Sequence, residues 1–579
     1  MNTPQVIALT FVAILIVCSA IFFPSSSVSE KDSQRPSTSA MTPTEGSTLS
    51  NDTVDNSTHS LEDKEESFSA TSLTTEPEFS DATSSTTNKH AADSTTPSGA
   101  PPRTRPHIVL VIADDMGYHD IGYHGSFIQT PTMDQLAYEG VRLENYYVQP
   151  VCSPTRSQLL SGRYQIHTGI QHSVFFSEQP IGLPTDNPTL ADQLQKSGYS
   201  THLVGKWHVG YYRREYLPHN RGFNSFFGKL QGHGDHYKHT RSYKGKQYLD
   251  LWQEDEPIRN ETGHYSTHLF TERAVRVVEN HDANTPLFLM LAYQAPHAPL
   301  QVPQSYKDLY KTKVNKKRRA FAGMVTAMDE GIANLTRALK HQGLWNNTLF
   351  IFSTDNGGDP KAGGNNYPLR GGKRTLWEGG IRGVAFVTGG ASLPISRGHV
   401  NKNLIHVSDW FPTLVAGVAG SRDNDTKPLD GVNQWPGLVR ANAPAARNMI
   451  LHNIDPLQKR RGRRLFSNKT FDTRKRAAIR VGDLKLITGV CGKGDWVAPP
   501  EKKSIKSKKA NENLKKNLWL FNITADPNET DDISKARPAD VRRLLDMLHS
   551  LDATSVPAYY PKKDPRANPA LHGNVWGPW

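Results

Sequence analysis

Four short polar segments of this 579-residue sequence carry side chains suited to chemistry, and each directly follows a run of apolar residues. The segments are Asp114-Asp115, Lys206-Trp207-His208, Gln294-Ala295-Pro296-His297 and Asp355-Asn356-Gly357. Each segment by itself would also suit a turn or a helix cap. In a doubly wound sheet, however, the carboxyl ends of the strands line the ligand crevice, so we expect the four segments to converge on one site.

A site for a divalent cation is predicted from the oxygen-bearing members of these segments. Asp114, Asp115, Asp355 and Asn356 offer hard oxygen ligands, and no Cys or His with zinc-like spacing stands beside them in the sequence. Such a ligand set suits Ca²⁺ or Mg²⁺ rather than a transition metal. The neutral carbonyl oxygen of Asn356 keeps the negative charge of the site from becoming excessive.

Cys152 is a further candidate, because it begins the segment Cys152-Ser-Pro-Thr-Arg156 directly before the apolar-periodic residues 157–160. Pro154 suits the first turn of a helix, so Cys152 is predicted at a helix N-terminus, where the helix dipole stabilises negative charge. The thiol could instead be a buried free cysteine or a thiolate nucleophile. A disulfide with Cys491 is also open, since only these two cysteines lie outside the N-terminal apolar segment.

Apolar runs that alternate with helical patterns predict the scaffold that must position these residues. The pattern is typical of an α/β fold with a large, mostly parallel sheet flanked by helices. We predict strands at residues 107–113, 200–204, 287–293, 349–353 and 384–387, and helices at 267–280 and 319–339. Strand candidates at 478–481, 484–488 and 518–521 predict a smaller C-terminal domain with an antiparallel sheet at residues 441–579, after a catalytic domain at 106–440.

The N-terminal residues predict entry into the secretory pathway. Residues 6–23 are apolar and uncharged, so residues 1–24 suit either a cleaved signal peptide or a retained type II membrane anchor. Residues 25–105 are rich in Ser, Thr, Pro and acidic residues, which predicts a disordered, O-glycosylated stalk. N-glycosylation sequons agree with a luminal or extracellular location and lie at Asn51, Asn260, Asn334, Asn346, Asn468, Asn522 and Asn528.

The formal net charge of +12 is uneven, and it is concentrated in residues 459–464 and 502–516. Such runs are solvated loops or a binding strip for a polyanion. A nucleic acid does not fit a partner met in the secretory pathway. A sulfated polysaccharide is the natural polyanion there.

The segment that begins at Cys152 and ends at Arg163 resembles the signature of type I sulfatases, whose core is Cys-x-Pro-x-Arg. From Pro106 onward the chain is similar to the arylsulfatase B group at residues 112–118, 204–208, 355–358, 369–373, 376–380, 518–522 and 526–529. The resemblance implies an alkaline-phosphatase-like sandwich with a smaller C-terminal domain. It also implies an arylsulfatase-type sulfuric ester hydrolase that removes the 4-sulfate of N-acetylgalactosamine in glycosaminoglycans.

In that family, a formylglycine-generating enzyme converts the signature cysteine to formylglycine. One hydroxyl of the hydrated aldehyde attacks sulfur, and the other later expels sulfate. By this resemblance, one Ca²⁺ would be bound by Asp114, Asp115, modified Cys152, Asp355 and Asn356. Arg156 would steady the formylglycine and His208 would hydrogen-bond its hydrate. Lys206, His297 and Lys373 would hold the sulfate or protonate the leaving alcohol.

Two other functions compete with this interpretation. A phosphatase or phosphodiesterase of the same superfamily would use Thr or Ser with two metals, and the signature around Cys152 argues against it. A catalytically silent, membrane-anchored glycosaminoglycan-binding protein would follow if Cys152 stayed unmodified. The loop at residues 232–236, together with His239, faces either the substrate or solvent. Lysosomal or cell-surface residence, the sugar linkage, exo or endo action and the oligomeric state are left open.

Overall fold

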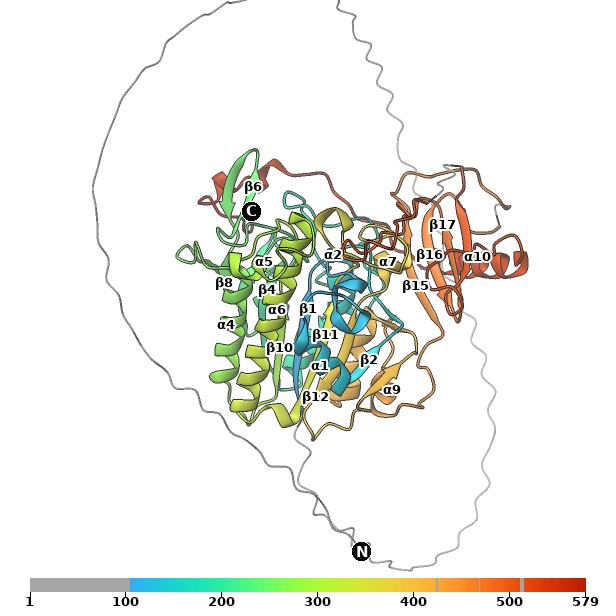
Figure 1. The fold of residues 1–579 in the computed structure, drawn as a ribbon. Helices are drawn as coiled ribbons and strands as arrows, with labels where there is room; N and C mark the ends of the chain where they lie inside the picture. The colour runs from blue at the N-terminus through green and yellow to red at the C-terminus, as the bar shows by residue number, and fades with distance from the viewer. Residues whose placement is uncertain (1–104, 423–424, 468, 511–514) are drawn as a thin grey trace, which may run out of the picture. The chain divides into compact units, whose positions relative to one another are not determined.

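A large mixed sheet lies at the centre of the fold in the computed structural model, which describes residues 105–422, 425–467, 469–510 and 515–579 (Figure 1). Within these residues, the strand order is β13-β2-β12-β11-β1-β10-β4-β5-β8-β9. The strands are β1 (His107–Ala113), β2 (Val141–Leu143), β4 (Ser200–Lys206), β5 (Ser225–Lys229), β8 (Trp252–Gln253), β9 (Glu256–Pro257), β10 (Leu287–Ala292), β11 (Thr348–Thr354), β12 (Ala385–Gly389) and β13 (His399–Asn401). Two small two-stranded sheets pair β3 (Tyr146–Tyr147) with β14 (Ile405–His406), and β6 (Thr240–Tyr243) with β7 (Lys246–Leu249).

The five strands β11, β1, β10, β4 and β5 are neighbours and run parallel. Every residue of β1, β10 and β11 is buried, as expected for strands that are covered on both faces. Beyond this parallel centre, β12 pairs antiparallel with β11. The predicted α/β fold with a mostly parallel sheet is confirmed, and all five predicted strands are present.

Successive residues of β1 point into two different hydrophobic cores, because side chains alternate along a strand. Val109 and Val111 pack with α4 and α6, whereas Ile108 and Leu110 belong to the core that contains α2, α3 and α8. Both predicted helices are present as α4 and α6. The helices are α1 (Pro131–Glu139), α2 (Cys152–Ser161), α3 (Leu190–Lys196), α4 (Ser266–Glu279), α5 (Gln304–Asp308), α6 (Lys316–His341), α7 (Glu378–Ile381), α8 (Trp410–Pro412), α9 (Trp435–Val439) and α10 (Pro538–Ala553).

A separate antiparallel sheet forms the C-terminal part, in the order β15-β16-β17-β18. Its strands are β15 (Met449–Asp455), β16 (Arg476–Val481), β17 (Leu484–Thr488) and β18 (Leu518–Asn522). Helix α10 covers this sheet and shares a hydrophobic core with it. The predicted small antiparallel sheet is confirmed, and β15 is an additional strand. The domain boundary at residue 440 stays a prediction.

The remaining N-terminal predictions concern residues that the structure does not describe. The apolar segment, residues 25–104 of the stalk and the sequon at Asn51 lie outside the described residues, as does the sequon at Asn468 farther along the chain. Among the helices in the described part of the chain, none is long and apolar enough to span a membrane.

A buried ion cluster joins strand β17 of the C-terminal sheet to helix α7 and strand β3. Lys485 of β17 is fully buried, and its Nζ donates to Glu378 Oε1 and Glu529 Oε1, each at 2.8 Å. Glu378 begins α7, and its Oε2 accepts a hydrogen bond from Tyr147 Oη at 2.8 Å. Burial and the neighbouring Glu378 raise the pKa of Glu529 to about 7, although Lys485 lowers it.

Replacing Lys485 with methionine should therefore destabilise the protein strongly. The change leaves buried Glu529 without its ion-pair partner and Glu378 with the more distant Arg382, and breaking a buried pair costs about 3–5 kcal/mol in comparable sites. The free energy of unfolding from urea titration measures the loss. Without Lys485 the pKa of Glu529 rises further, and the pKa of Glu378 rises from its lowered value. The folded variant then binds protons more tightly, so its deficit should shrink toward about pH 5 and grow as the pH rises.

Lys516→Met is the matched control, because Lys516 forms an ion pair with Asp532 that is partly exposed to solvent. Such pairs contribute about 0–1 kcal/mol. Equal losses in the two variants would show that the buried cluster stabilises the fold no more than an exposed ion pair does.

Candidate active site

The four polar segments meet at one edge of the sheet, because they follow neighbouring parallel strands. Asp114 follows β1, Asp355 follows β11, His297 comes after β10, and Lys206 is the last residue of β4. Two residues of the segments, Asp115 and His208, adopt left-handed backbone conformations with φ of 68° and 60°. Such conformations are costly for non-glycine residues and gather at functional sites.

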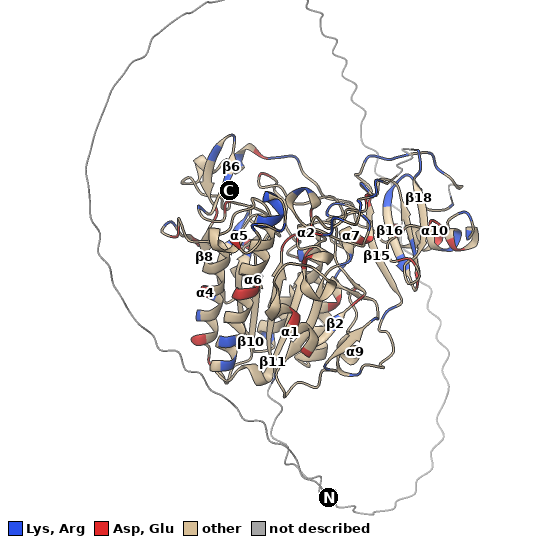
Figure 2. Ribbon diagram, in the orientation of Figure 1, with Lys and Arg blue, Asp and Glu red and all other residues tan. Residues whose placement is uncertain are grey.

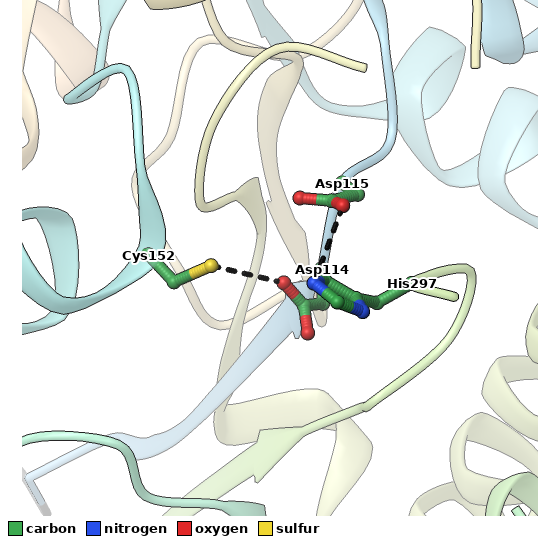
Figure 3. A group of neighbouring side chains, drawn as sticks. All are labelled: Asp114, Asp115, Cys152 and His297. Atoms are coloured by element: carbon green, nitrogen blue, oxygen red, sulfur yellow. Dashed lines mark hydrogen bonds and ion pairs between the residues drawn. The ribbon is translucent and has the colours of Figure 1, made fainter. Parts of the chain in front are cut away.

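A cluster of potential metal ligands lies at this edge. One ligand atom from each of Asp114, Asp115, Cys152 and His297 lies within 4.8 Å of the others (Figure 3). The Sγ atom of Cys152 is 3.5 Å from Asp114 Oδ1, and Nε2 of His297 is 3.5 Å from Asp115 Oδ2. The ligand set predicted from the sequence had Asp355 and Asn356 in place of His297.

Asp355 and Asn356 nevertheless belong to the same constellation. The backbone N–H of Asp115 donates to Asp355 Oδ1 at 3.2 Å, and the Asn356 Nδ2 group donates to Asp115 Oδ1 at 2.8 Å. The structure therefore brings all five predicted ligands together, including Cys152.

Three buried cations compensate the carboxylates. Lys206 donates to Asp114 Oδ2 at 2.6 Å, and Lys373 forms an ion pair with Asp115. Because a buried carboxylate without a partner is costly, these cations stabilise the acidic cluster. Burial opposes the ionisation of Asp115, but His297 and Lys373 outweigh it and hold its pKa below the usual range.

Arg156 is the third cation, and it is fully buried. Its Nε and Nη2 donate to Asp355 Oδ2 at 3.2 and 3.0 Å, and its Nη1 donates to the carbonyl oxygen of Lys206 at 3.0 Å. Arg156 thus ties helix α2 to the ends of β11 and β4. Burial and the nearby Asp114 raise the pKa of Asp355 even so.

Asn356 supplies the observation that tests whether a hard cation fits here. Its Oδ1 is buried and accepts no hydrogen bond from the described residues. A buried acceptor without a donor is the exception in folded proteins, and a cation would satisfy it. Together with three carboxylates, this oxygen makes a set of ligands that fits Ca²⁺ or Mg²⁺.

Cys152 is the first residue of α2 and is 2% exposed, so its predicted place at a helix N-terminus is correct. Thr155 fixes this end of the helix, because its Oγ1 donates to the carbonyl oxygen of Asp355 at 2.6 Å. Burial and Asp355 raise the pKa of the Cys152 thiol to about 12. Burial and the negative charge of Asp355 thus disfavour a thiolate, despite the position at a helix N-terminus. Cys491 is also free, so the two cysteines form no disulfide.

A cavity of about 870 Å³ opens above this cluster. Its wall includes Cys152, His208, His297 and Lys373. Lys206 is instead fully buried behind Asp114. Of the predicted catalytic residues, four thus reach the cavity, while Lys206 and Arg156 hold the cluster in place from behind.

His208 presents one free ring nitrogen. Its Nε2 lies 3.2 Å from the carbonyl oxygen of Phe175, which only accepts, so Nε2 carries the hydrogen. The buried Nδ1 has no hydrogen-bond partner in the described part of the chain and is left as an acceptor. Burial and the charge of Lys206 hold the pKa of His208 well below its usual range. A Cβ on Gly232 would come within 2.5 Å of this ring, so glycine is needed for the close approach.

The loop at residues 232–236 borders the cavity, as expected for the first of its two predicted positions. Residues 232–235 line the cavity, and the ring of His233 stacks on His297 with 5.9 Å between ring centroids. His236 is buried behind the loop, where its Nε2 contacts the carbonyl oxygen of His297 at 3.1 Å. His239 is buried and does not line the cavity.

Sequence reasoning missed several residues of the cavity wall. Arg241 comes from β6, Arg374 follows Lys373, and Arg476 lies at the start of β16. His172 and Asp455 form an ion pair there at 2.9 Å. Arg374 adjoins a recognised motif and could have been found from it. The others come from segments without a motif, and long-range packing alone brings them to the cavity.

Comparison with known proteins decides what this geometry serves. The family model for sulfatases matches residues 106–420, more than half of the chain. The chain belongs to the sulfatase family. It is therefore a sulfuric ester hydrolase, and the predicted family is confirmed.

Individual relatives agree with this assignment. Arylsulfatase J of Mus musculus is 47% identical over 491 residues, covering 83% of this chain and 81% of that protein. N-acetylgalactosamine-6-sulfatase of Homo sapiens is 30% identical over 362 residues, covering 59% of this chain and 67% of that protein. The crystal structure of Ps i-CgsB in complex with k-i-k-neocarrahexaose is 28% identical with a TM-score of 0.66, covering 81% of this chain and 97% of that one.

Proposed function

We propose that this sulfatase removes the 4-sulfate of N-acetylgalactosamine in glycosaminoglycans, with one Ca²⁺ and a formylglycine made from Cys152. The observation that carries the proposal is the position of Cys152, at a helix N-terminus in the cavity wall and 3.5 Å from the Asp114 carboxylate. Its signature supports conversion by a formylglycine-generating enzyme. When present, formylglycine supplies a hydrated aldehyde whose hydroxyl is the nucleophile.

Oxygen ligands of the cluster would hold the Ca²⁺ ion. They are Asp114, Asp115, Asp355 and Asn356, with the modified residue 152. A bound Ca²⁺ would supply positive charge next to the sulfate oxygens. The unpartnered Oδ1 of Asn356 supports this ligand set.

Charged side chains in the cavity wall suit a sulfate ester. Its transition state spreads negative charge over the sulfate oxygens, as in phosphoryl transfer, and a preorganised cation stabilises that charge. Lys373 is such a cation and reaches the cavity. Lys206 is fully buried against Asp114, which supports a positioning contribution through that carboxylate rather than contact with sulfate.

The two histidines suit different proton transfers. Nδ1 of His297 lies 2.6 Å from the carbonyl oxygen of Ala298, which only accepts, so Nδ1 carries a hydrogen. Its Nε2 is then the atom that can exchange a proton with the leaving alcohol. Nδ1 of His208 is the free acceptor, and it can hold a hydroxyl of the modified residue 152.

A location in the secretory pathway is part of the proposal. Asn260 and Asn346, two of the sequon residues, are exposed and could carry glycans. The apolar N-terminal segment of the sequence supports the same route.

The proposed substrate can be tested with chondroitin or dermatan oligosaccharides that end in a 4-sulfated or a 6-sulfated N-acetylgalactosamine. We expect the 4-sulfated fragment to be desulfated faster, and heparan fragments to be poor substrates. Moving the sulfate to the 6-position displaces the sugar ring in the cavity. One charge-assisted hydrogen bond lost in this way costs about 1.5–3 kcal/mol, or about 10- to 100-fold in kcat/KM.

Turnover of a small aryl sulfate is the control, because it shows that the enzyme is active whatever sugar it prefers. A preference for the 6-sulfated or heparan fragment would refute the proposed linkage and keep the sulfatase chemistry. Activity on the aryl sulfate without any on the sugars would point to another class of sulfate ester.

A further inference from the structure

We infer that a basic surface next to the cavity binds the chain of an anionic polysaccharide beyond the sugar that is desulfated. We call this surface the basic track and define it by Arg374, Arg476, Lys459, Arg461 and Arg463. The inference rests on the proposed function, because it assigns the track to the polymer whose sulfate the cavity receives.

Within the cavity wall, the track begins with two arginines. Nη2 of Arg476 donates to the carbonyl oxygen of Arg374 at 2.9 Å, so the two residues are neighbours. Nε of Arg476 is buried and has no hydrogen-bond partner among the described residues. A guanidinium that retains an unused donor at a cavity wall is suited to an anionic group of a ligand.

Continuity with the cavity is the second observation. Gln458 lines the cavity, and the next residue, Lys459, opens the basic segment at 459–464. The backbone N–H of Arg461 donates to the carbonyl oxygen of Arg474 at 3.3 Å, two residues before Arg476. The segment therefore leaves the cavity rim along the start of β16, where Figure 2 shows further Lys and Arg on the neighbouring loops.

The three side chains of the track that come from the basic segment are available for a partner, whereas Arg374 pairs with Asp359 at 2.7 Å. Those of Lys459, Arg461 and Arg463 form no hydrogen bond or ion pair with any described residue, and Lys459 and Arg463 are exposed. Arg460 differs, because it shares Asp472 with Arg474. Three unpaired cations side by side repel one another, and a polyanion relieves this repulsion.

The backbone that carries these side chains is anchored. Nδ2 of Asn517 donates to the carbonyl oxygens of Arg461 and Arg463 at 3.1 and 2.9 Å. The second basic segment of the sequence also ends here, since a Cβ on Gly462 would come within 2.9 Å of the carbonyl oxygen of Lys515. A surface held in this way loses less conformational entropy when it binds a chain.

An anionic polysaccharide fits the track better than an anionic membrane. The cations lead out of a concave cavity, and a flexible chain whose end lies in the cavity can follow them, whereas a flat bilayer reaches only the outer part. Sulfate and carboxylate groups spaced along the chain match arginine's planar fork of donors.

Kinetics on substrates of different length test the inference. They compare the wild-type protein with a triple variant that carries Lys459→Gln, Arg461→Gln and Arg463→Gln. The substrates are chondroitin 4-sulfate chains, a 4-sulfated disaccharide and 4-nitrophenyl sulfate. We expect the ratio of kcat/KM for the long chains to that for 4-nitrophenyl sulfate to fall about tenfold in the variant, which corresponds to about 1.4 kcal/mol. The loss should lie in KM, and the advantage of long chains over the disaccharide should shrink as salt screens the track.

The matched control is the triple variant Arg276→Gln, Arg337→Gln, Lys340→Gln. It makes the same change of charge near the C-terminal ends of α4 and α6. These ends lie away from the cavity edge, because the helices run opposite to the parallel strands. The control should leave the ratio unchanged. An equal fall in both variants, or an unchanged ratio in the variant of the track, would overturn the inference.

Retention on immobilised chondroitin 4-sulfate separates this inference from the proposed function. The wild type should elute at higher salt than the variant of the track. If the wild-type protein hydrolyses 4-nitrophenyl sulfate but no chondroitin sulfate, the proposed substrate is wrong. Retention on the column still decides whether the track binds the polysaccharide. Equal retention of both proteins, combined with binding to phosphatidylserine vesicles that only the variant loses, would assign the surface to membranes and refute the inference.

Discussion

Replacing Asp355 with asparagine is expected to lower kcat by about 10²–10³, which is the usual cost of one lost electrostatic contact in an active site. The change keeps the size of the side chain and an acceptor oxygen for Arg156, but it removes one negative charge from the proposed Ca²⁺ ligands. Asp355→Ala should lose more, because it also leaves the fully buried Arg156 without its anion. We therefore expect several orders of magnitude in kcat and a loss of stability from the alanine variant.

Activity on 4-nitrophenyl sulfate and the Ca²⁺ content of the purified enzyme measure these effects. The asparagine variant should retain the melting temperature of the wild type more closely than the alanine variant. If Asp355→Asn kept full activity and a full complement of Ca²⁺, the metal assignment would be wrong.

Asp409→Asn offers the matched control, since Asp409 and Arg447 form a second buried acid–arginine pair. Asp409 does not line the cavity and is absent from the metal-ligand cluster. Its loss should reduce stability and leave kcat nearly unchanged. The comparison separates the general cost of a broken buried pair from the specific cost of a missing ligand.

Much of the active-site edge was predictable because its strands have the strongest patterns in the sequence. Strands β1, β10 and β11 are continuous apolar runs, since both faces of a parallel sheet are covered. Each run is followed by polar residues, and parallel neighbours place those residues at one edge. The sequence order and this single rule were enough to predict that Asp114, Asp355 and His297 lie close together.

The side walls of the cavity were not predictable by the same reasoning. Strands β6 and β7 are short and polar, and the apolar run of β15 is interrupted by His452 and Asn453. None of the three strands therefore shows a clear hydrophobic period. Arg241 and Arg476 reach the cavity through contacts between distant segments. A pattern confined to neighbouring residues does not contain that information.

Differences between chemically similar residues also required the structure. Lys206 and Lys373 had the same expected contribution, yet Lys206 is fully buried against Asp114 and Lys373 reaches the cavity. Their variants should differ accordingly. The depth of a side chain depends on the loops that cover it, and these loops carry no recognisable motif.

Cys152→Ala should be inactive at every pH, and the wild type should carry formylglycine at position 152. The reason is chemical. A thiolate that attacked sulfur would form an S-sulfo adduct, which has no second hydroxyl from which to expel sulfate, so an unmodified enzyme would stop after one turnover. Mass spectrometry of the tryptic peptide that contains residue 152 tests the modification. Turnover of 4-nitrophenyl sulfate tests the activity of Cys152→Ala.

The timing of the modification follows from burial. Every residue of α2, from Cys152 to Ser161, is buried in the folded protein. An enzyme that modifies Cys152 must bind the segment in an extended form, so it has to act before folding is complete. Protein that is produced without the formylglycine-generating enzyme and is then folded should remain unmodified and inactive when the enzyme is added afterwards.

Pro154 and Arg156 separate recognition of the signature from catalysis. Both belong to the core of the signature, so Pro154→Ala and Arg156→Lys should each lower the fraction of modified protein. Activity per formylglycine should stay near the wild-type value in Pro154→Ala, since the proline side chain carries no polar atom that could bind the metal, the sulfate or a carboxylate of the cluster. Arg156→Lys should lose activity per formylglycine as well, because lysine does not replace the paired contacts of Nε and Nη2 with Asp355. Fully active enzyme with an unmodified Cys152 would refute the formylglycine mechanism, although the fold and the acidic cluster would stand.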